Sequence, residues 1–79
     1  MNNIRTYLKK YTSLPLSAIK GLLENYFLVN GIDIYDVDIV IQRKRNDNEN
    51  MNLLIYEKGK IIFTLSLKSD NLGETWKIL

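Results

Sequence analysis

Three aspartates, Asp33, Asp36 and Asp38, form the tightest group of side chains that could do chemistry. On a strand, Asp36 and Asp38 would point the same way with their Cα atoms about 7 Å apart. The Asp-x-Asp-x-Asp-Gly spacing of a calcium loop and its terminal glutamate are missing, which argues against a divalent cation site. A chain of 79 residues hardly encloses a sugar between two carboxylates. We therefore predict no metal and no cofactor here.

Nucleophilic catalysis lacks its usual partners, because the chain has no histidine and no cysteine. No base is present to activate a serine, and no serine lies in a Gly-x-Ser-x-Gly turn. The four glycines are isolated, so no glycine-rich phosphate loop is present. The serines considered are Ser13, Ser17, Ser66 and Ser69. We predict that the protein is not an enzyme.

Length and composition predict one small domain over residues 1–79, with 46% hydrophobic and 25% charged residues. No disulfide is available, so apolar burial must supply most of the stability. No apolar run resembles a signal peptide or reaches the ~20 residues of a membrane span. We expect a cytoplasmic protein of a bacterial host that does not bind membranes.

Helical periodicity covers the first third of the chain. Ile4, Tyr7, Leu8 and Tyr11 follow the i, i+3, i+4, i+7 spacing, which predicts a helix over 4–11. The only proline suits the start of a second helix over 15–29, and the Asn-Gly pair at 30–31 suits its end.

The period changes to two after residue 36, where β-branched residues alternate with polar ones. Gly59 supplies the positive φ of a tight hairpin turn. Strands are predicted over 37–44, 51–57, 60–67 and 74–79. The predicted fold is α+β, with two N-terminal helices packed on one side of an antiparallel sheet of about four strands.

Charge lies in blocks, although the net charge is only +2. A nucleic-acid-binding surface would combine the basic face of the first helix with the trio that follows the first strand. The simpler interpretation is a solvated hairpin end, and no DNA- or RNA-binding signature accompanies the cations. The residues of this alternative are Arg5, Lys9, Lys10, Arg43, Lys44 and Arg45.

Tyr35 lies between the aspartates and is the aromatic residue that we most expect to be exposed. Exposed aromatic residues are frequent anchors of protein interfaces. We therefore predict a partner-binding cluster of Asp33, Tyr35, Asp36 and Asp38, which would meet a basic surface.

Several segments together resemble the phage uracil-DNA glycosylase inhibitor family. The resemblance lies in chain length, a Leu14-Pro15 helix start, the order of strands, and residues 38–41, 48–54, 65–67, 69–71 and 77–79. Asparagine and isoleucine are also frequent, as in AT-rich Gram-positive bacteria and their phages.

The resemblance implies a non-enzymatic inhibitor, encoded by a phage or mobile element, that blocks a host nucleic-acid-acting enzyme or defence complex. The partner would be uracil-DNA glycosylase or a defence nuclease. The resemblance also implies an apolar groove between helix and sheet that captures an apolar residue of the enzyme; its walls would be Ile19, Leu22, Leu23, Ile41, Leu54 and Leu65. The family is acidic, so this net cation cannot mimic DNA over its whole surface.

Overall fold

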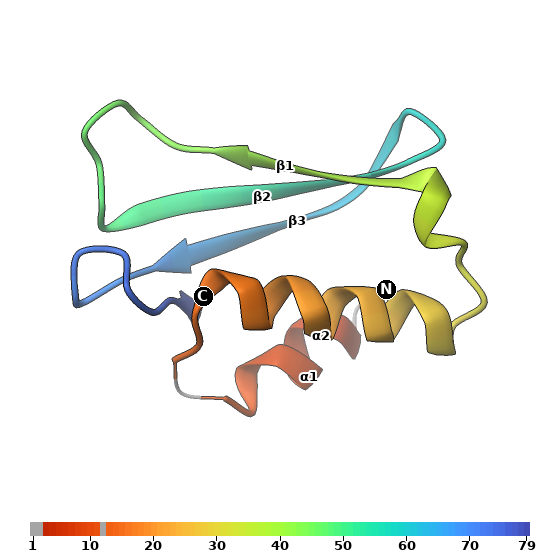
Figure 1. Ribbon diagram of the computed structural model, residues 1–79, viewed down its shortest axis with the longest axis horizontal. Coiled ribbons are helices and arrows are strands. Elements are labelled where there is room, and N and C mark those ends of the chain that lie inside the picture. Colours follow the sequence, from red (N-terminus) through yellow and green to blue (C-terminus); the bar gives the residue numbers. More distant parts are fainter. Residues whose placement is uncertain (1–2, 12) are drawn as a thin grey trace.

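The computed structural model describes residues 3–11 and 13–79 and has two layers, helices below and a sheet above (Figure 1). The elements are α1 (Asn3–Lys9), α2 (Leu16–Val29), a short 3₁₀ helix η1 (Ile34–Asp36), β1 (Val37–Gln42), β2 (Asn50–Glu57), β3 (Lys60–Lys68) and β4 (Lys77–Ile78). The strands are antiparallel in the order β1-β2-β3-β4. The predicted α+β fold is confirmed.

The helix α2 lies along the sheet and places one stripe of side chains in the core. Ile19, Leu23 and Phe27 recur every four residues and are completely buried. The Pro15 carbonyl accepts the first hydrogen bonds, from the N–H groups of Ala18 and Ile19. Proline suits this position because its own N–H would be unpaired there.

The end of α2 has the geometry of a Schellman motif. The Ile32 N–H donates to the Phe27 carbonyl at 2.8 Å, and the Gly31 N–H donates to the Leu28 carbonyl at 3.2 Å. Gly31 has a φ of +73°, which a residue with a Cβ adopts only at a cost. The Asn-Gly stop signal is thus confirmed.

The helix α1 buries Ile4 and Leu8 and ends at Lys9, two residues before the predicted end. Past that point the Tyr11 N–H still donates to the Leu8 carbonyl at 3.2 Å, but the helix does not continue. α1 contacts β4 and α2, so it lies at the β4 side of the molecule.

The β2–β3 hairpin is the longest ladder of the sheet. Its turn has positive φ at both Lys58 (52°) and Gly59 (80°), as a two-residue type I′ turn requires. Met51, Leu53 and Ile55 of β2 are buried toward the helices, whereas the residues between them belong to the outer face.

A β-bulge in β3 interrupts the regular alternation of faces along that strand. The register shifts so that Tyr56 pairs with Ile61 while Ile55 pairs with Phe63, which leaves Ile62 as the extra residue. Ile62 packs against the core and Ile61 is exposed on the outer face, the reverse of strict alternation. A bulge of one residue exchanges the two faces in this way.

The strand β1 ends at Gln42, not at residue 44 as predicted, because an ordered turn begins there. The Asp47 side chain accepts hydrogen bonds from the backbone N–H groups of Glu49 (2.9 Å) and Asn50 (3.0 Å). The Asp47 N–H donates to the Lys44 carbonyl at 3.1 Å. The residues between β1 and β2 therefore form a defined turn that closes the ladder early.

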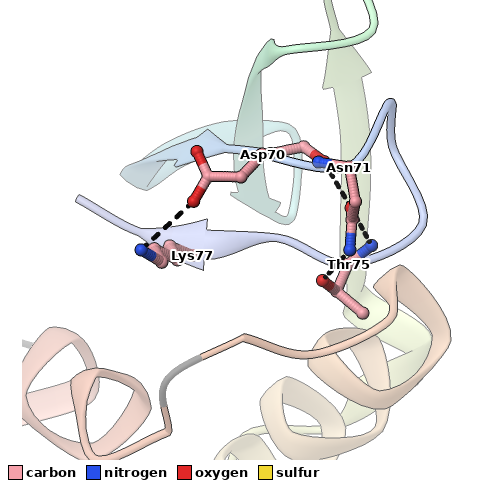
Figure 2. Close-up of polar contacts among 5 residues, drawn as sticks. Asp70, Asn71, Thr75 and Lys77 are labelled. Carbon is pink, nitrogen blue, oxygen red and sulfur yellow. Dashed lines mark hydrogen bonds and ion pairs between the residues drawn. The ribbon is translucent and has the colours of Figure 1, made fainter.

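The last strand is also shorter than the predicted 74–79, because residues 69–75 fold into a polar loop. Asn71 is at its centre: its Oδ1 accepts from the Thr75 N–H at 2.9 Å and its Nδ2 donates to the Thr75 Oγ1 at 2.7 Å (Figure 2). The buried Ser69 hydroxyl donates to Asn71 Oδ1 and accepts from the Gly73 N–H, both at 2.9 Å. Asp70 and Lys77 form an exposed ion pair at 3.3 Å, also drawn in Figure 2.

Beyond this loop, the chain returns to its own beginning. Leu14 and Trp76 exchange backbone hydrogen bonds of 3.0 and 2.7 Å as an isolated bridge. Trp76 is buried in the same core as α1 and α2, so it is a core residue and not a surface anchor.

Candidate functional site

The predicted cluster around Tyr35 forms a surface between α2 and β1. The Asp33 Oδ1 accepts from the Tyr35 N–H at 3.0 Å, and the Asp33 carbonyl accepts from the Asp36 N–H at 2.9 Å. These bonds start η1 and fix the chain direction. Tyr35 is 92% exposed, which confirms the expectation for this ring.

Two exposed apolar side chains lie at the end of α2, the helix that contacts η1. Leu28 and Val29, at the end of α2, are 71% and 76% exposed, and α2 contacts η1, where Ile34 is also exposed. We call this surface the acidic corner. Its residues are Leu28, Val29, Asp33, Ile34, Tyr35 and Asp36.

Asp38 lies just beyond the acidic corner, in β1. It pairs with Tyr56 of β2 and belongs to the outer face of the sheet. Within residues 3–11 and 13–79, no group of three or more carboxylates is placed to hold a metal ion. The three aspartates are therefore neighbours along the chain and do not converge on one point.

The predicted apolar groove is wrong. Ile19 and Leu23 of α2 and Leu65 of β3 are completely buried in the core between the helices and the sheet. No open space therefore remains between helix and sheet at these positions. Leu54 belongs to the opposite face, because it alternates with the buried Leu53 and Ile55. The remaining two residues, Leu22 and Ile41, are half-buried beside the core and exposed at the sheet edge, respectively.

The basic residues do not gather on one surface. The basic trio, residues 43–45, follows β1, at one edge of the sheet. Lys9 ends the helix α1, which contacts β4 at the other edge, and Lys10 follows directly after it. Lys10 lies over the Tyr7 ring, with Nζ 5.8 Å from the centroid. The side chain of Arg5 lies outside the described part of the structure.

A hollow of about 620 Å³ lies beside the basic trio. The polar side chains that line it come from the end of β1, the following turn and the outer face of the sheet. Its lining residues are Gln42, Arg43, Lys44, Asp47, Asn50, Met51, Asn52, Ser66, Leu67 and Leu79. None of these described residues is aromatic, so the hollow offers no ring for a base to stack on.

Asp47 supplies the negative charge of this hollow. The backbone N–H groups of Glu49 and Asn50, followed by the charge of Lys44, hold the pKa of Asp47 below its ordinary value of 3.8. The carboxylate is thus already paired, and it partly compensates the neighbouring cations.

Leu28 and Val29 were missed by the sequence analysis. The helical stripe accounts for Ile19, Leu23 and Phe27, and the two apolar residues that follow Phe27 lie off that stripe. An apolar pair on the polar side of a helix was the available signal.

In the described residues, every helix is too short or too polar to cross a bilayer. Compared with protein-family models, with curated proteins and with solved structures, the chain gives no match.

Proposed function

We propose that the protein is a non-enzymatic inhibitor that binds another protein through the acidic corner. The observation that supports this proposal is the exposure of Leu28, Val29 and Tyr35 on a domain whose core is otherwise well filled. Large exposed apolar groups in one patch, with polar residues around them, are typical of interaction sites. Tyrosine in particular buries a large area at little entropic cost.

The charge of the corner indicates the kind of partner. Asp33 and Asp36 flank the exposed ring and would face a basic protein surface, such as the groove of an enzyme that acts on nucleic acids. Complementary charge would accelerate association, and the apolar centre would slow dissociation. The resemblance to the uracil-DNA glycosylase inhibitors makes a host glycosylase the first target to test.

Inhibition would not use an apolar groove between helix and sheet, because Ile19, Leu23 and Leu65 fill that space. The protein would instead cover the groove of its target with the acidic corner. Blocking by coverage requires no chemistry from the inhibitor.

The test is a uracil-excision assay with purified glycosylase and micromolar inhibitor, comparing the wild type with Tyr35→Ala and Leu28→Ser. Each substitution removes an exposed side chain without opening the core. We expect inhibition by the wild type and at least about 30-fold weaker inhibition by Tyr35→Ala, as for an interface anchor worth ~2 kcal/mol. Tyr11→Ala is the matched control, because Tyr11 is also exposed but lies just after α1, away from the acidic corner in the sequence.

Unchanged uracil excision rejects glycosylase as the target. Pull-down from a Gram-positive lysate then tests the inhibitor class, with the wild type, Tyr35→Ala and Tyr11→Ala as parallel baits. A host enzyme that is lost only with Tyr35→Ala supports the proposal. If all three baits retain the same proteins, the acidic corner is not the interface.

The alternative is a small nucleic-acid-binding domain that uses Arg43, Lys44 and Arg45. The hollow beside Arg43 and Lys44 favours it, since phosphate groups bind such cations. Titration of labelled single- and double-stranded DNA and RNA at about 50 and 200 mM salt would show affinity that falls steeply with salt. The double change Arg43→Glu and Arg45→Glu should abolish that binding; no binding at the lower salt removes the alternative.

A further inference from the structure

The strand β1 is an open sheet edge. It pairs with β2 on one side, and no described residue pairs with its other side. Proteins usually protect such an edge with lysine, proline or a bulge. The uncovered start of β3 has two of these, Lys60 and the bulge at Ile62. The strand β1, Val-Asp-Ile-Val-Ile-Gln, has no lysine, proline or bulge, and Asp38 is its one charged residue.

The apolar residues of β1 remain partly exposed on both faces. Val40 is 43% exposed on the outer face, and Ile41 is 46% exposed on the helix face. A second strand added to this edge would cover both.

The main chain of β1 is oriented to accept such a strand. The Lys58 N–H donates to the Asp36 carbonyl at 2.9 Å, so the groups of residue 36 point toward β2. In an antiparallel ladder this orientation alternates from one residue to the next. Val37, Ile39 and Ile41 therefore point their N–H and carbonyl groups toward the free edge.

Charge at the two ends of β1 selects the occupant. Asp36 and Asp38 lie at its start, and Arg43 and Lys44 follow its end. An antiparallel copy of the same strand brings the acidic end of each chain against the basic end of the other. The edge is complementary to itself, as an interface with twofold symmetry requires.

We propose that two copies of this chain associate by antiparallel pairing of β1 with β1, centred on Val40. In this register Val40 faces Val40 of the second copy, and Ile39 and Ile41 exchange main-chain hydrogen bonds. Asp36 then lies opposite Lys44, and Asp38 lies opposite Gln42. Both helix layers remain on the same side of one continuous sheet.

This inference goes beyond the proposed inhibitor function, since it concerns the protein alone. It leaves Leu28 and Tyr35 outside the paired strand. Because every measurement below uses the purified chain without a partner, failure of the dimer and failure of the inhibitor function are distinguishable.

The first measurement is sedimentation velocity of the wild type across the micromolar range at low salt. We expect a concentration-dependent equilibrium between monomer and dimer that weakens at high salt, because exposed ion pairs are screened. A monomer at every concentration overturns the proposal.

The second measurement uses two charge-reversed variants, Asp36→Lys/Asp38→Lys and Arg43→Glu/Lys44→Glu. Each variant alone places like charges together, and its self-association should fall by at least about tenfold. An equimolar mixture should restore the dimer, because the fully basic edge of one variant meets the fully acidic edge of the other. Circular dichroism melts establish that both variants are folded. Dimers of either variant alone, or a mixture that stays monomeric, overturn the pairing.

The third measurement tests the register. The chain has no cysteine, so Val40→Cys introduces a single thiol at the symmetry centre, where Cβ atoms of opposed residues lie about 4.5–5.5 Å apart. Mild oxidation should yield a disulfide-linked dimer. Gln42→Cys is the matched control on the same edge and face: its two thiols would lie roughly 13 Å apart by strand rise and should not link. Preferential linkage through Gln42→Cys overturns the register.

Discussion

The two edges of the sheet, β1 and β4, differ in how far the main chain and the apolar side chains are covered. At the β4 edge, β4 pairs with the last residues of β3, Leu14 bridges to Trp76, and α1 contacts β4. At the β1 edge, β1 pairs with β2 on one side and with no described residue on the other, and two of its apolar residues remain exposed. The comparison indicates that the β4 edge contributes more to the free energy of unfolding, whereas the β1 edge is available for contacts.

The largest expected loss of stability is at the β4 edge, for Trp76→Ala. Trp76 is buried in the core cluster that also contains residues of α1, α2 and the sheet. Loss of the ring should lower the free energy of unfolding by about 3–5 kcal/mol, measured by urea denaturation. A loss below about 1 kcal/mol would show that the β4 edge contributes little to the free energy of unfolding.

Ser69→Ala should have the next largest effect. The buried Ser69 hydroxyl accepts from the Gly73 N–H, which would lose its partner. An unsatisfied buried group costs about 1–3 kcal/mol in free energy of unfolding. Ser66→Ala is the control, because the exposed Ser66 hydroxyl bonds only to Asn52 among the bonds described and should cost less than Ser69→Ala.

The turn after β1 should show a pH dependence traceable to Asp47. Its pKa is lower in the folded protein, so its contribution is complete above the ordinary value of 3.8 and is lost as the pH falls below it. Thermal melts of the wild type and of Asp47→Asn should differ at neutral pH and converge toward pH 3. Parallel curves would mean that the charge of Asp47 does not stabilise the turn.

The smallest effect on the monomer is expected at the open edge, for Ile41→Thr. The side chain is 46% exposed and threonine suits a strand, so the free energy of unfolding should change by less than about 1 kcal/mol. Dilute samples should be used, because any dimer would add its own stability. A loss as large as that for Trp76→Ala would mean that the β1 and β4 edges of the sheet do not differ in their contribution to stability.

Periodicity was sufficient to predict the helices, the strands and their layering, because each element buries one regular face. Ile19, Leu23 and Phe27 illustrate this for α2. Periodicity failed where a single residue interrupts the repeat: the bulge at Ile62 exchanges the two faces of β3, and the Asp47 turn ends β1 early. Both depend on backbone hydrogen bonds that residue types alone do not reveal.

The candidate site was predictable only in part. The exposure of Tyr35 follows from its position between two acids, but the contribution of Leu28 and Val29 depends on α2 ending beside η1. The apolar groove failed for the opposite reason. Residues suited to line a cavity are also suited to fill a core, and only the packing of Ile19 against the sheet decides between them.

The bridge between Leu14 and Trp76 has a consequence for biosynthesis. The helices and the β1–β2–β3 meander can assemble from neighbouring segments, whereas this bridge joins a residue that precedes α2 to a residue made only after β3. On the ribosome, the nascent chain would hold an incomplete domain until the segment after β3 leaves the exit tunnel.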